Sequence, residues 1–287
     1  MRSFGGTLQR MAYRTFPDWT VLKQPVFIVG CGRSGTTVLG ELLGQHRRLA
    51  YLNEPRHIWF IEPRTDVWTE RARERKGAIR LTARDVKPAV AAQIRREFAV
   101  AVRLNHGTRL VEKLPINSFR IDFINQIFPD AMYIHLIRNG IEVARSIASL
   151  AGRNEWQGHD GYRWQLLAAL AREHGDEQLV ELCHDHFHRG LLEWRLSVTA
   201  AREALDAIPQ NRRLEIRYKG LLRQPLTTCT LLEDFIGVEP SEEMRQFAKD
   251  RIARRSPPAD TGALTPAGRY IAGDLLAELG YLNPSVC

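Results

Sequence analysis

The sequence predicts one α/β domain, with a central, mainly parallel β-sheet flanked by helices. Three observations support this class. Short apolar, β-branched runs alternate with segments of helical periodicity, which is the order of βαβ units. The first run leads directly into a glycine-rich turn and then a helix. No internal repeat or low-complexity tract divides the 287 residues. We therefore expect an N-terminal extension at 1–24 and a single domain at 25–287.

Five segments have the composition of strands. The first, at 25–30 (PVFIVG), is continuously apolar and ends at glycine, which is typical of a parallel strand covered on both faces. The other four are also short and alternate with helical segments. The predicted strands are 25–30, 49–53, 108–113, 132–138 and 212–218.

Helical spacing fills the intervals between these strands. Thr36 begins the first helical segment, which continues to Gln45. A helix of about twenty residues is expected to start near Asp85, with Pro88 in its first turn. Asn139 is a candidate N-cap for the helix after the fourth strand. Further helical segments are expected at 116–128, 162–208 and 271–282.

Charge and cysteine content restrict the surroundings of the protein. The formal net charge is +8, from 41 basic and 33 acidic residues, which suits a polyanionic ligand and equally an arginine-rich solubilising surface. No run of about 18 apolar residues and no signal peptide is found, so we expect a cytoplasmic protein without stable membrane insertion. The cysteines lack metal-ligand spacing and are expected to be free thiols in a reducing compartment. They are Cys31, Cys183, Cys229 and Cys287.

The turn after the first strand has the features of an anion-binding loop. Residues 30–37 (GCGRSGTT) lie between a buried strand and a helix, where backbone amides and the helix dipole favour phosphate or sulfate. Gly30 and Gly35 have the separation of the phosphate loop of nucleoside triphosphatases, G-x-x-x-x-G-K-[ST]. Thr36 stands where that loop has lysine, and Arg33 supplies a cation instead. A purely structural turn is the alternative.

The run Arg33-Ser34-Gly35-Thr36-Thr37 resembles the first cofactor motif of sulfotransferases that use 3′-phosphoadenosine-5′-phosphosulfate (PAPS), a strand followed by [K/R]-[ST]-G-T-T and a helix. The resemblance implies the P-loop-like sulfotransferase fold for 25–287. It also implies that this run holds the 5′-phosphosulfate of PAPS and, after transfer, of its product 3′-phosphoadenosine-5′-phosphate (PAP).

Two further segments extend the resemblance. Arg138 and Ser146, in IHLIRNGIEVARSI, match the second motif, whose Arg and Ser bind the nucleotide 3′-phosphate. Eight residues span slightly over two helical turns, so both side chains can reach one anion. A surface Arg with a Ser tolerated in a helix is the alternative. Tyr218 follows a strand in a block similar to R-Y-x-x-L…P, which implies a place near the adenine, although a packed core tyrosine would look the same. The intervals 55–107 and 150–210 are unmatched in detail.

Sulfuryl transfer requires a base for the acceptor hydroxyl and positive charge for the leaving phosphate oxygen. Glu54, directly after the second strand, lies where α/β sheets bind ligands. Carbohydrate and tyrosyl-protein sulfotransferases have Glu at this place, and the Glu-Pro pair is most similar to the carbohydrate group. Lys113 resembles the family lysine that contacts the bridging oxygen, and with Arg33 it would stabilise the departing nucleotide. His57 is the second choice for the base, or an acceptor-binding group; a solvated Glu and a surface Lys remain the alternatives.

A metal site and an acceptor site were considered in the unmatched intervals. His184 and His188 share a helix face in ELCHDHFH (181–188), but three histidines at these spacings cannot converge from one helix. We predict no metal, because sulfate carries less charge than phosphate. The expected acceptor is a carbohydrate or glycolipid hydroxyl, with no nucleic-acid partner and no prediction of oligomeric state. Four aromatic residues could stack on sugars or simply pack: Trp59, Trp68, Trp156 and Trp164.

Two other functions compete with this interpretation. A P-loop kinase or nucleoside triphosphatase would need the loop lysine and an acidic magnesium ligand at a strand end, and neither is present in the expected form. A non-catalytic nucleotide-binding protein of the same fold would not need Glu54 and Lys113 beside its cofactor motifs. The missing membrane anchor differs from the Golgi sulfotransferases and fits a bacterial enzyme better.

Overall fold

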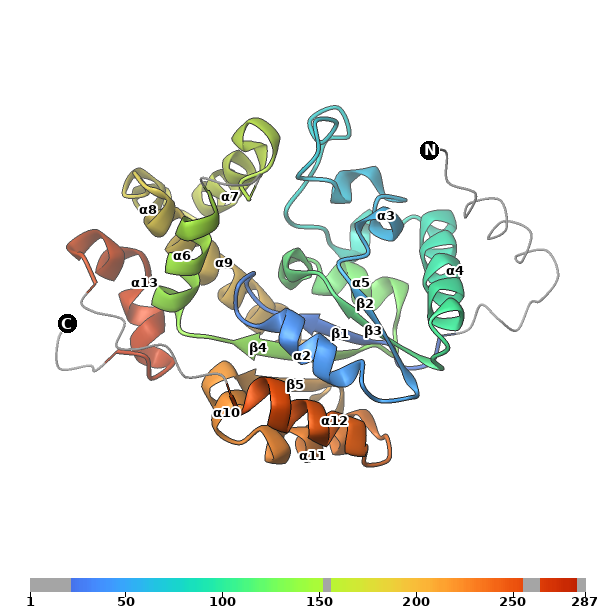
Figure 1. The fold of residues 1–287 in the computed structure, drawn as a ribbon. Coiled ribbons are helices and arrows are strands. Elements are labelled where there is room, and N and C mark those ends of the chain that lie inside the picture. Colours follow the sequence, from blue (N-terminus) through green and yellow to red (C-terminus); the bar gives the residue numbers. More distant parts are fainter. Residues whose placement is uncertain (1–21, 152–155, 255–263, 283–287) are drawn as a thin grey trace.

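The computed structural model describes residues 22–151, 156–254 and 264–282. Five strands, all parallel, form one sheet in the order β2-β3-β1-β4-β5 (Figure 1). The predicted class, a parallel sheet flanked by helices, is confirmed, and every predicted strand is found to within one residue at each end. The strands are β1 Val26–Val29, β2 Leu49–Asn53, β3 Arg109–Lys113, β4 Met132–Ile137 and β5 Arg213–Arg217.

The carboxyl ends of the strands meet at one edge of the sheet. Lys113, which ends β3, is in register with Asn53 at the end of β2 and with Ile28 of β1. Ile137 and Arg217 are paired at the ends of β4 and β5. Loops that leave these ends therefore lie side by side, which is the usual ligand-binding edge of a parallel α/β sheet.

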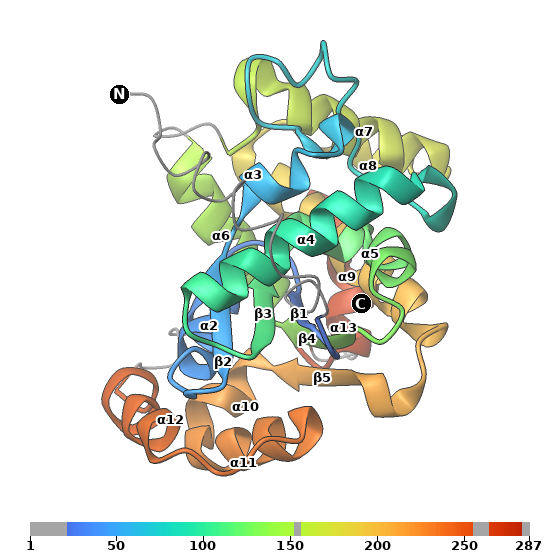
Figure 2. The ribbon, with the colours of Figure 1, turned by 90° about the vertical axis from the view of Figure 1, so that its right-hand side faces the viewer.

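Helices cover both faces of the sheet and bury two apolar cores. One core lies between the sheet and the layer at the bottom of Figure 1, formed by α2 Thr36–Leu43, α10 Tyr218–Arg223, α11 Pro225–Ile236 and α12 Glu242–Phe247. In Figure 2, α4 crosses the sheet on the other face. The helices of that second layer are α3 Arg56–Trp59, α4 Pro88–Leu104, α5 Ile121–Ile127, α6 Gly140–Ala151, α7 Tyr162–Glu173, α8 Glu177–Glu181, α9 His186–Asp206 and α13 Pro266–Glu278.

Two helices begin later than the spacing suggested. α4 starts at Pro88 because a residue before proline avoids helical dihedrals, and Lys87 is extended with ψ 129°. Ala83–Asp85 forms a separate 3₁₀ turn, closed by a capping box with Thr82. The segment 116–128 divides in the same way, because Arg120 leaves helical geometry (φ −129°) between the 3₁₀ turn Pro115–Phe119 and α5.

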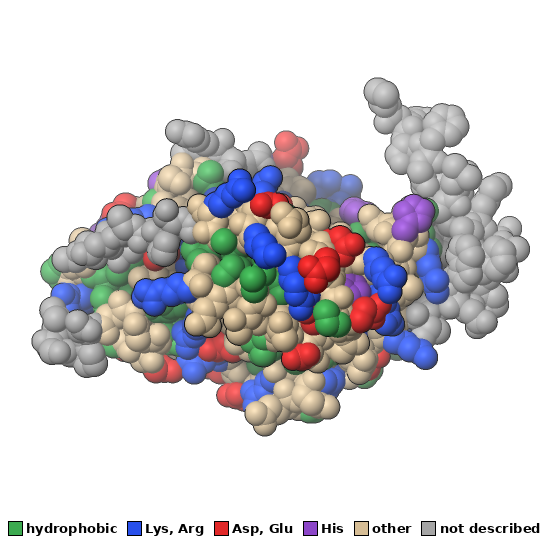
Figure 3. All heavy atoms as spheres, turned by 60° about the horizontal axis from the view of Figure 1, so that its bottom comes forward, with side chains coloured by type: hydrophobic (Ala, Val, Ile, Leu, Met, Phe, Trp, Pro, Cys, Tyr) green, Lys and Arg blue, Asp and Glu red, His purple; other side chains and the backbone are tan. Residues whose placement is uncertain are grey.

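The outer face of the α11–α12 layer carries both charges. Figure 3 shows basic and acidic side chains interspersed over this side of the molecule. Several are paired, as in Arg245 with Glu233 at 2.9 Å and Arg254 with Asp250 at 3.3 Å. The basic surplus of the sequence is therefore not gathered into one patch here. Within the described ranges, no helix is both long and apolar enough to cross a membrane.

Candidate active site

The phosphate loop, residues 30–37, connects β1 to α2 in a conformation that needs glycine. Gly30 has φ 148° and Gly35 has φ 93°, both in the region that side chains disfavour. Arg33 also has positive φ, 71°, and its side chain is exposed. A non-glycine residue in this region costs on the order of 1–3 kcal/mol, and such strain persists only where neighbouring contacts fix it. The loop therefore presents the Arg33 guanidinium at the edge where the strands end.

Each glycine of the loop lies against a different neighbour. A Cβ on Gly30 would come within 2.5 Å of the Leu136 carbonyl oxygen on β4. On Gly32 it would meet the indole ring of Trp156 at 2.5 Å, and on Gly35 the ring of Tyr218 at 2.4 Å. These distances are far inside van der Waals contact. The three glycines thus let a strand and two aromatic rings close on the loop.

The two predicted cofactor motifs meet in space. Arg33 Nε donates to Ser146 Oγ on α6 at 3.0 Å, across 113 residues of sequence. Arg138 Nη1 donates to the Arg33 carbonyl at 3.1 Å, and its guanidinium lies 4.7 Å from the ring centroid of Tyr218. Glu142, which the sequence analysis did not single out, accepts from Arg138 Nε at 2.7 Å and fixes its direction. Four predicted cofactor residues therefore form one cluster.

The loop also has an unfilled polar group that suits an anion. Ser34 is 1% exposed, and its Oγ has no hydrogen-bond partner among the residues that the structure describes. A buried hydroxyl without a partner is costly, so a ligand oxygen would satisfy it. Thr36 is buried and Thr37 exposed at the start of α2, where free amides favour negative charge. The residues present fit the phosphosulfate end of PAPS.

Glu54 and Lys113 form an ion pair at the next strand ends. Lys113 Nζ donates to Glu54 Oε1 at 2.7 Å, and the Glu54 amide donates to the Lys113 carbonyl at 2.8 Å. Arg56 binds the other carboxylate oxygen at 2.8 Å. Burial alone would raise the pKa of Glu54, but Lys113 and Arg56 together hold it below the ordinary glutamate value. The carboxylate is therefore ionised and the 1%-exposed Lys113 has a compensating charge.

His57 does not join this pair. It lies on α3, exposed, and makes no hydrogen bond to any residue that the structure describes. A buried acid close by was missed instead. Glu112 accepts from Trp59 Nε1 at 2.9 Å and from Asn117 Nδ2 at 3.2 Å, and burial raises its pKa to about 8. The only sequence signal was a charged residue inside an apolar strand.

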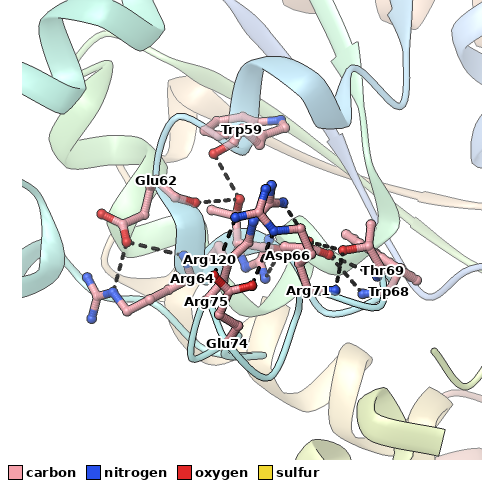
Figure 4. Close-up of polar contacts among 11 residues, drawn as sticks. Trp59, Glu62, Arg64, Asp66, Trp68, Thr69, Arg71, Glu74, Arg75 and Arg120 are labelled. Atoms are coloured by element: carbon pink, nitrogen blue, oxygen red, sulfur yellow. Dashed lines mark hydrogen bonds and ion pairs between the residues drawn. The ribbon is translucent and has the colours of Figure 1, made fainter. Parts of the chain in front are cut away.

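Residues 55–82 form an irregular segment, which we call the cap. Arg120, which lies outside the cap in the sequence, holds it in place. Arg120 is 1% exposed and donates to three carbonyl oxygens of the cap: to Ile79 at 3.1 Å, Thr65 at 3.0 Å and Ala78 at 2.7 Å. Figure 4 shows its guanidinium at the centre of the cap contacts. One side chain outside the cap therefore fixes both of its halves.

A second buried charge organises the cap from within. Asp66 accepts from the amides of Trp68 and Thr69 at 3.1 Å, from the Thr69 hydroxyl, and from Arg75 at 2.7 Å. The carboxylate is fully buried, and although burial would raise its pKa, these donors lower it. Such a network defines a single loop conformation in a segment that has almost no regular secondary structure.

The four tryptophans considered as sugar platforms have different surroundings. Trp59 is 1% exposed and packs in the core, so it cannot stack on an acceptor. Trp156 is engaged with Gly32. Trp68 and Trp164 are half-buried, with the guanidinium groups of Arg56 and Arg189 at 4.2 and 5.0 Å from their rings. Of the four, Trp68 and Trp164 remain candidates for stacking on a sugar ring of the acceptor.

The histidine run has a structural explanation. Asp185 caps α9 by accepting from the His188 amide at 2.9 Å. The His188 ring contacts Asp185 Oδ1 and Thr265 Oγ1, both at 2.9 Å. It therefore joins α9 to Thr265, the residue that precedes α13. Among the described residues, no three His, Cys, Asp or Glu side chains are grouped as metal ligands.

Comparison with known proteins gives several relatives named protein-tyrosine sulfotransferases and one uncharacterized protein. Protein-tyrosine sulfotransferase 2 of Gallus gallus is 21% identical over 276 residues, covering 90% of this chain and 67% of that protein. Protein-tyrosine sulfotransferase A of Caenorhabditis elegans is 29% identical over 216 residues, covering 74% and 50%. An uncharacterized protein of Aquifex aeolicus is 30% identical over 150 residues, 48% of this chain. The chain spans only 18% of the Aquifex protein and 34% of protein-tyrosine sulfotransferase 1 of Homo sapiens.

Solved structures share the fold. Sulfotransferase STF9 from Mycobacterium avium superimposes with a TM-score of 0.58 at 19% identity, covering 96% of this chain and 82% of that one. The sulfotransferase domain of the curacin biosynthetic pathway gives 0.56 at 18% identity, covering 92% and 99%. The fold is therefore the P-loop-like sulfotransferase fold. Since the sulfotransferase family model matches residues 25–243, well over half of the sequence, the chain belongs to the sulfotransferase family.

Proposed function

We propose that this protein transfers a sulfuryl group from PAPS to a hydroxyl of an acceptor and releases PAP. The observation that carries the proposal is the cluster of Arg33, Arg138 and Ser146, which joins the phosphate loop to a second anion-binding position on α6. A nucleotide with phosphates at both its 5′ and 3′ ends requires two such positions. PAPS would supply the activated sulfuryl group. Arg138 can bind a 3′-phosphate with two parallel hydrogen bonds.

The chain's own residues divide the remaining work. Glu54 would accept the acceptor proton at a carboxylate oxygen, with Arg56 orienting it. Lys113 and Arg33 would supply positive charge where the leaving phosphate oxygen becomes more negative. Lys113 is buried with a single acidic partner, so a bound anion would give its ammonium a second one. With two cations in these roles, no metal ion is required, and activity should survive EDTA.

For the acceptor we propose a carbohydrate or glycolipid hydroxyl, bound beneath the cap. The half-buried rings of Trp68 and Trp164 and the Glu54-Pro55 pair support this class. A tyrosyl hydroxyl is a second candidate, because curated relatives are named protein-tyrosine sulfotransferases. A carboxylate held ionised by two cations is a weak base, better matched to a phenol with a pKa of about 10 than to an alcohol. Labelled PAPS offered with oligosaccharides and with tyrosine peptides would separate the two classes.

We place the reaction in the cytoplasm. Cys31, Cys183 and Cys229 are buried free thiols, which suits a reducing compartment. Cys287 lies outside the described residues, as does most of the N-terminal extension at 1–24.

Calorimetry with PAP, ATP and AMP tests the donor. PAP should bind at least tenfold more tightly than the other two, because only PAP has a 3′-phosphate for Arg138 and Ser146. Equal affinity for all three would contradict the assignment, and preference for ATP would favour a kinase. A sulfated product from labelled PAPS separates an enzyme from a nucleotide-binding protein without turnover.

A further inference from the structure

A buried ion pair lies directly behind the phosphate loop. Arg163 of α7 and Glu193 of α9 are joined by two bonds, Nη2 to Oε1 at 2.6 Å and Nη1 to Oε2 at 3.0 Å, and both residues are about 95% buried. Burying such a pair is costly unless further hydrogen bonds compensate. Trp156 provides them: its Nε1–H donates to Glu193 Oε2 at 3.0 Å, and its carbonyl accepts from Arg163 at 3.1 Å.

Trp156 connects this pair to the loop. Its six-membered ring occupies the space that a Cβ on Gly32 would need, with ring carbons at 2.5 and 2.8 Å. The Arg163 guanidinium lies 5.5 Å from the ring centroid, so the indole is held between the ion pair and the loop backbone. Neither Arg163 nor Glu193 has a part in the proposed chemistry. The indole therefore links this pair to the backbone of the loop by direct contact.

The loop needs support at this point. Arg33, the residue after Gly32, has the left-handed conformation that a side chain disfavours. Its carbonyl is held by Arg138, and the Ser34 amide donates to the Cys31 carbonyl at 3.1 Å. The first bond acts after Gly32 and the second closes the turn from Cys31 to Ser34 around it, whereas Trp156 packs against Gly32 itself.

We propose that Trp156 is a positioning residue, which holds Gly32 and Arg33 in the anion-binding conformation before the nucleotide arrives. The inference rests on the proposed function, since the anion is the 5′ end of PAPS. A loop that is competent only part of the time binds more weakly in proportion to that fraction. The layer of α7 and α9 thereby sets the affinity of a ligand that it does not contact.

Four variants measured by calorimetry with PAP test the proposal. Trp156→Ala should weaken PAP about tenfold, as the loop loses its support, whereas Trp156→Phe keeps a ring and should stay within about threefold. Gly32→Ala should weaken PAP at least tenfold, because the added Cβ would collide with the indole. The φ of Gly32 is not left-handed, and among the described residues no other atom comes closer than 3.8 Å to that Cβ, so the indole is the obstacle that is tested. In the double variant Gly32→Ala/Trp156→Ala that obstacle is gone, so affinity should be no weaker than in Trp156→Ala.

Losses that multiply in the double variant, or wild-type affinity in a folded Trp156→Ala, would overturn the proposal. Tyr270→Ala is the control, because this exposed aromatic residue of α13 bonds Gln178 of α8 and has no role in the site, so PAP affinity should stay unchanged. The same four variants are also unfolded by heat without nucleotide. If wild type binds PAP no better than ATP, the cofactor assignment fails. A Tm loss from Gly32→Ala that disappears in the Trp156→Ala background would still support the contact between the Trp156 indole and Gly32. Additive Tm losses contradict it.

Discussion

The two sides of the site are built in different ways. On the nucleotide side, Arg33, Arg138 and Ser146 come from short strand-loop-helix units, and the contacts among them are few and direct. On the acceptor side, the cap has almost no regular structure and depends on Arg120 and Asp66, buried charges that hold carbonyls and amides. The first design suits the one donor that we propose, while the second fixes a loop through its backbone and so depends little on the sequence of that loop. Binding of the donor and choice of the acceptor should therefore be separable by mutation.

Glu54 adjoins both sides of the site. Its substitution should give the largest difference between the effect on turnover and the effect on PAP affinity. Glu54→Gln keeps size and polarity but removes the base, so turnover should fall by about 10²–10⁴ while PAP affinity stays near wild type. Lys113→Ala should lower turnover too, with some loss of PAP affinity. Initial rates with labelled PAPS and calorimetry measure the two effects. Glu74→Gln, at an exposed cap carboxylate that pairs with Arg71, is the control. Full turnover in Glu54→Gln would move the base to another group, and His57 would be tested next.

Arg120→Met should damage only the acceptor side. It leaves three buried carbonyls without donors, so we expect a loss of about 3 kcal/mol in the free energy of unfolding and a raised acceptor KM. PAP affinity of the folded variant should be unchanged. Denaturant unfolding and steady-state kinetics measure these quantities. Arg71→Met, at an exposed arginine of the same cap, should change stability by less than about 0.5 kcal/mol. A weakened PAP site in Arg120→Met would show that the two sides are coupled.

Arg138→Ala should damage the nucleotide side of the site and leave the acceptor side intact. Loss of a charged hydrogen bond should weaken PAP binding by about 1.5–3 kcal/mol. AMP has no 3′-phosphate, so its binding should weaken less, through the lost bond to the Arg33 carbonyl alone. Arg254→Ala is the control, because Arg254 pairs with Asp250 four residues before it, as Arg138 pairs with Glu142 four residues after it. The Arg254 pair is exposed and lies on the opposite face of the sheet, so its loss should not change the affinity for PAP or AMP. If PAP and AMP weaken equally, the 3′-phosphate binds elsewhere.

The acid limb of the pH profile sharpens the assignment of the base. Lys113 and Arg56 lower the pKa of Glu54, so its carboxylate stays charged as the pH falls and protonates only below the ordinary value of about 4.3. The logarithm of kcat/KM should therefore stay level down to that region and then decline. An imidazole base would place the decline near 6.5. Circular dichroism over the same range separates protonation from acid unfolding.

Sequence was sufficient where one local signal determined the outcome. The strands were located because continuous apolar runs between glycine-rich turns have few other uses. Arg33, Arg138 and Ser146, which the structure brings together, could be picked out because their motifs are short. Arg120 could not be found, since its partners are carbonyls 41 to 55 residues away and carbonyls have no sequence signature. Trp156 was one of four tryptophans expected either to stack on a sugar or to pack, because nothing in the sequence places an indole against Gly32. Glu112 was not identified, because the strand could be predicted from the residues around it and nothing in the sequence besides its own charge indicated a buried acid.

The position of Arg120 has a consequence for the history of the cap. The cap leaves the sheet after β2 and returns before α4, so recombination could exchange it as one continuous piece without breaking a strand. The arginine that fastens it lies outside that piece, between Phe119 and Ile121. A grafted loop would be accepted only if it offered carbonyls at the same three points, or brought its own fastening residue. With the proposed acceptor site beneath the cap, new acceptor specificities would arise under one fixed geometric condition, set by the buried Arg120.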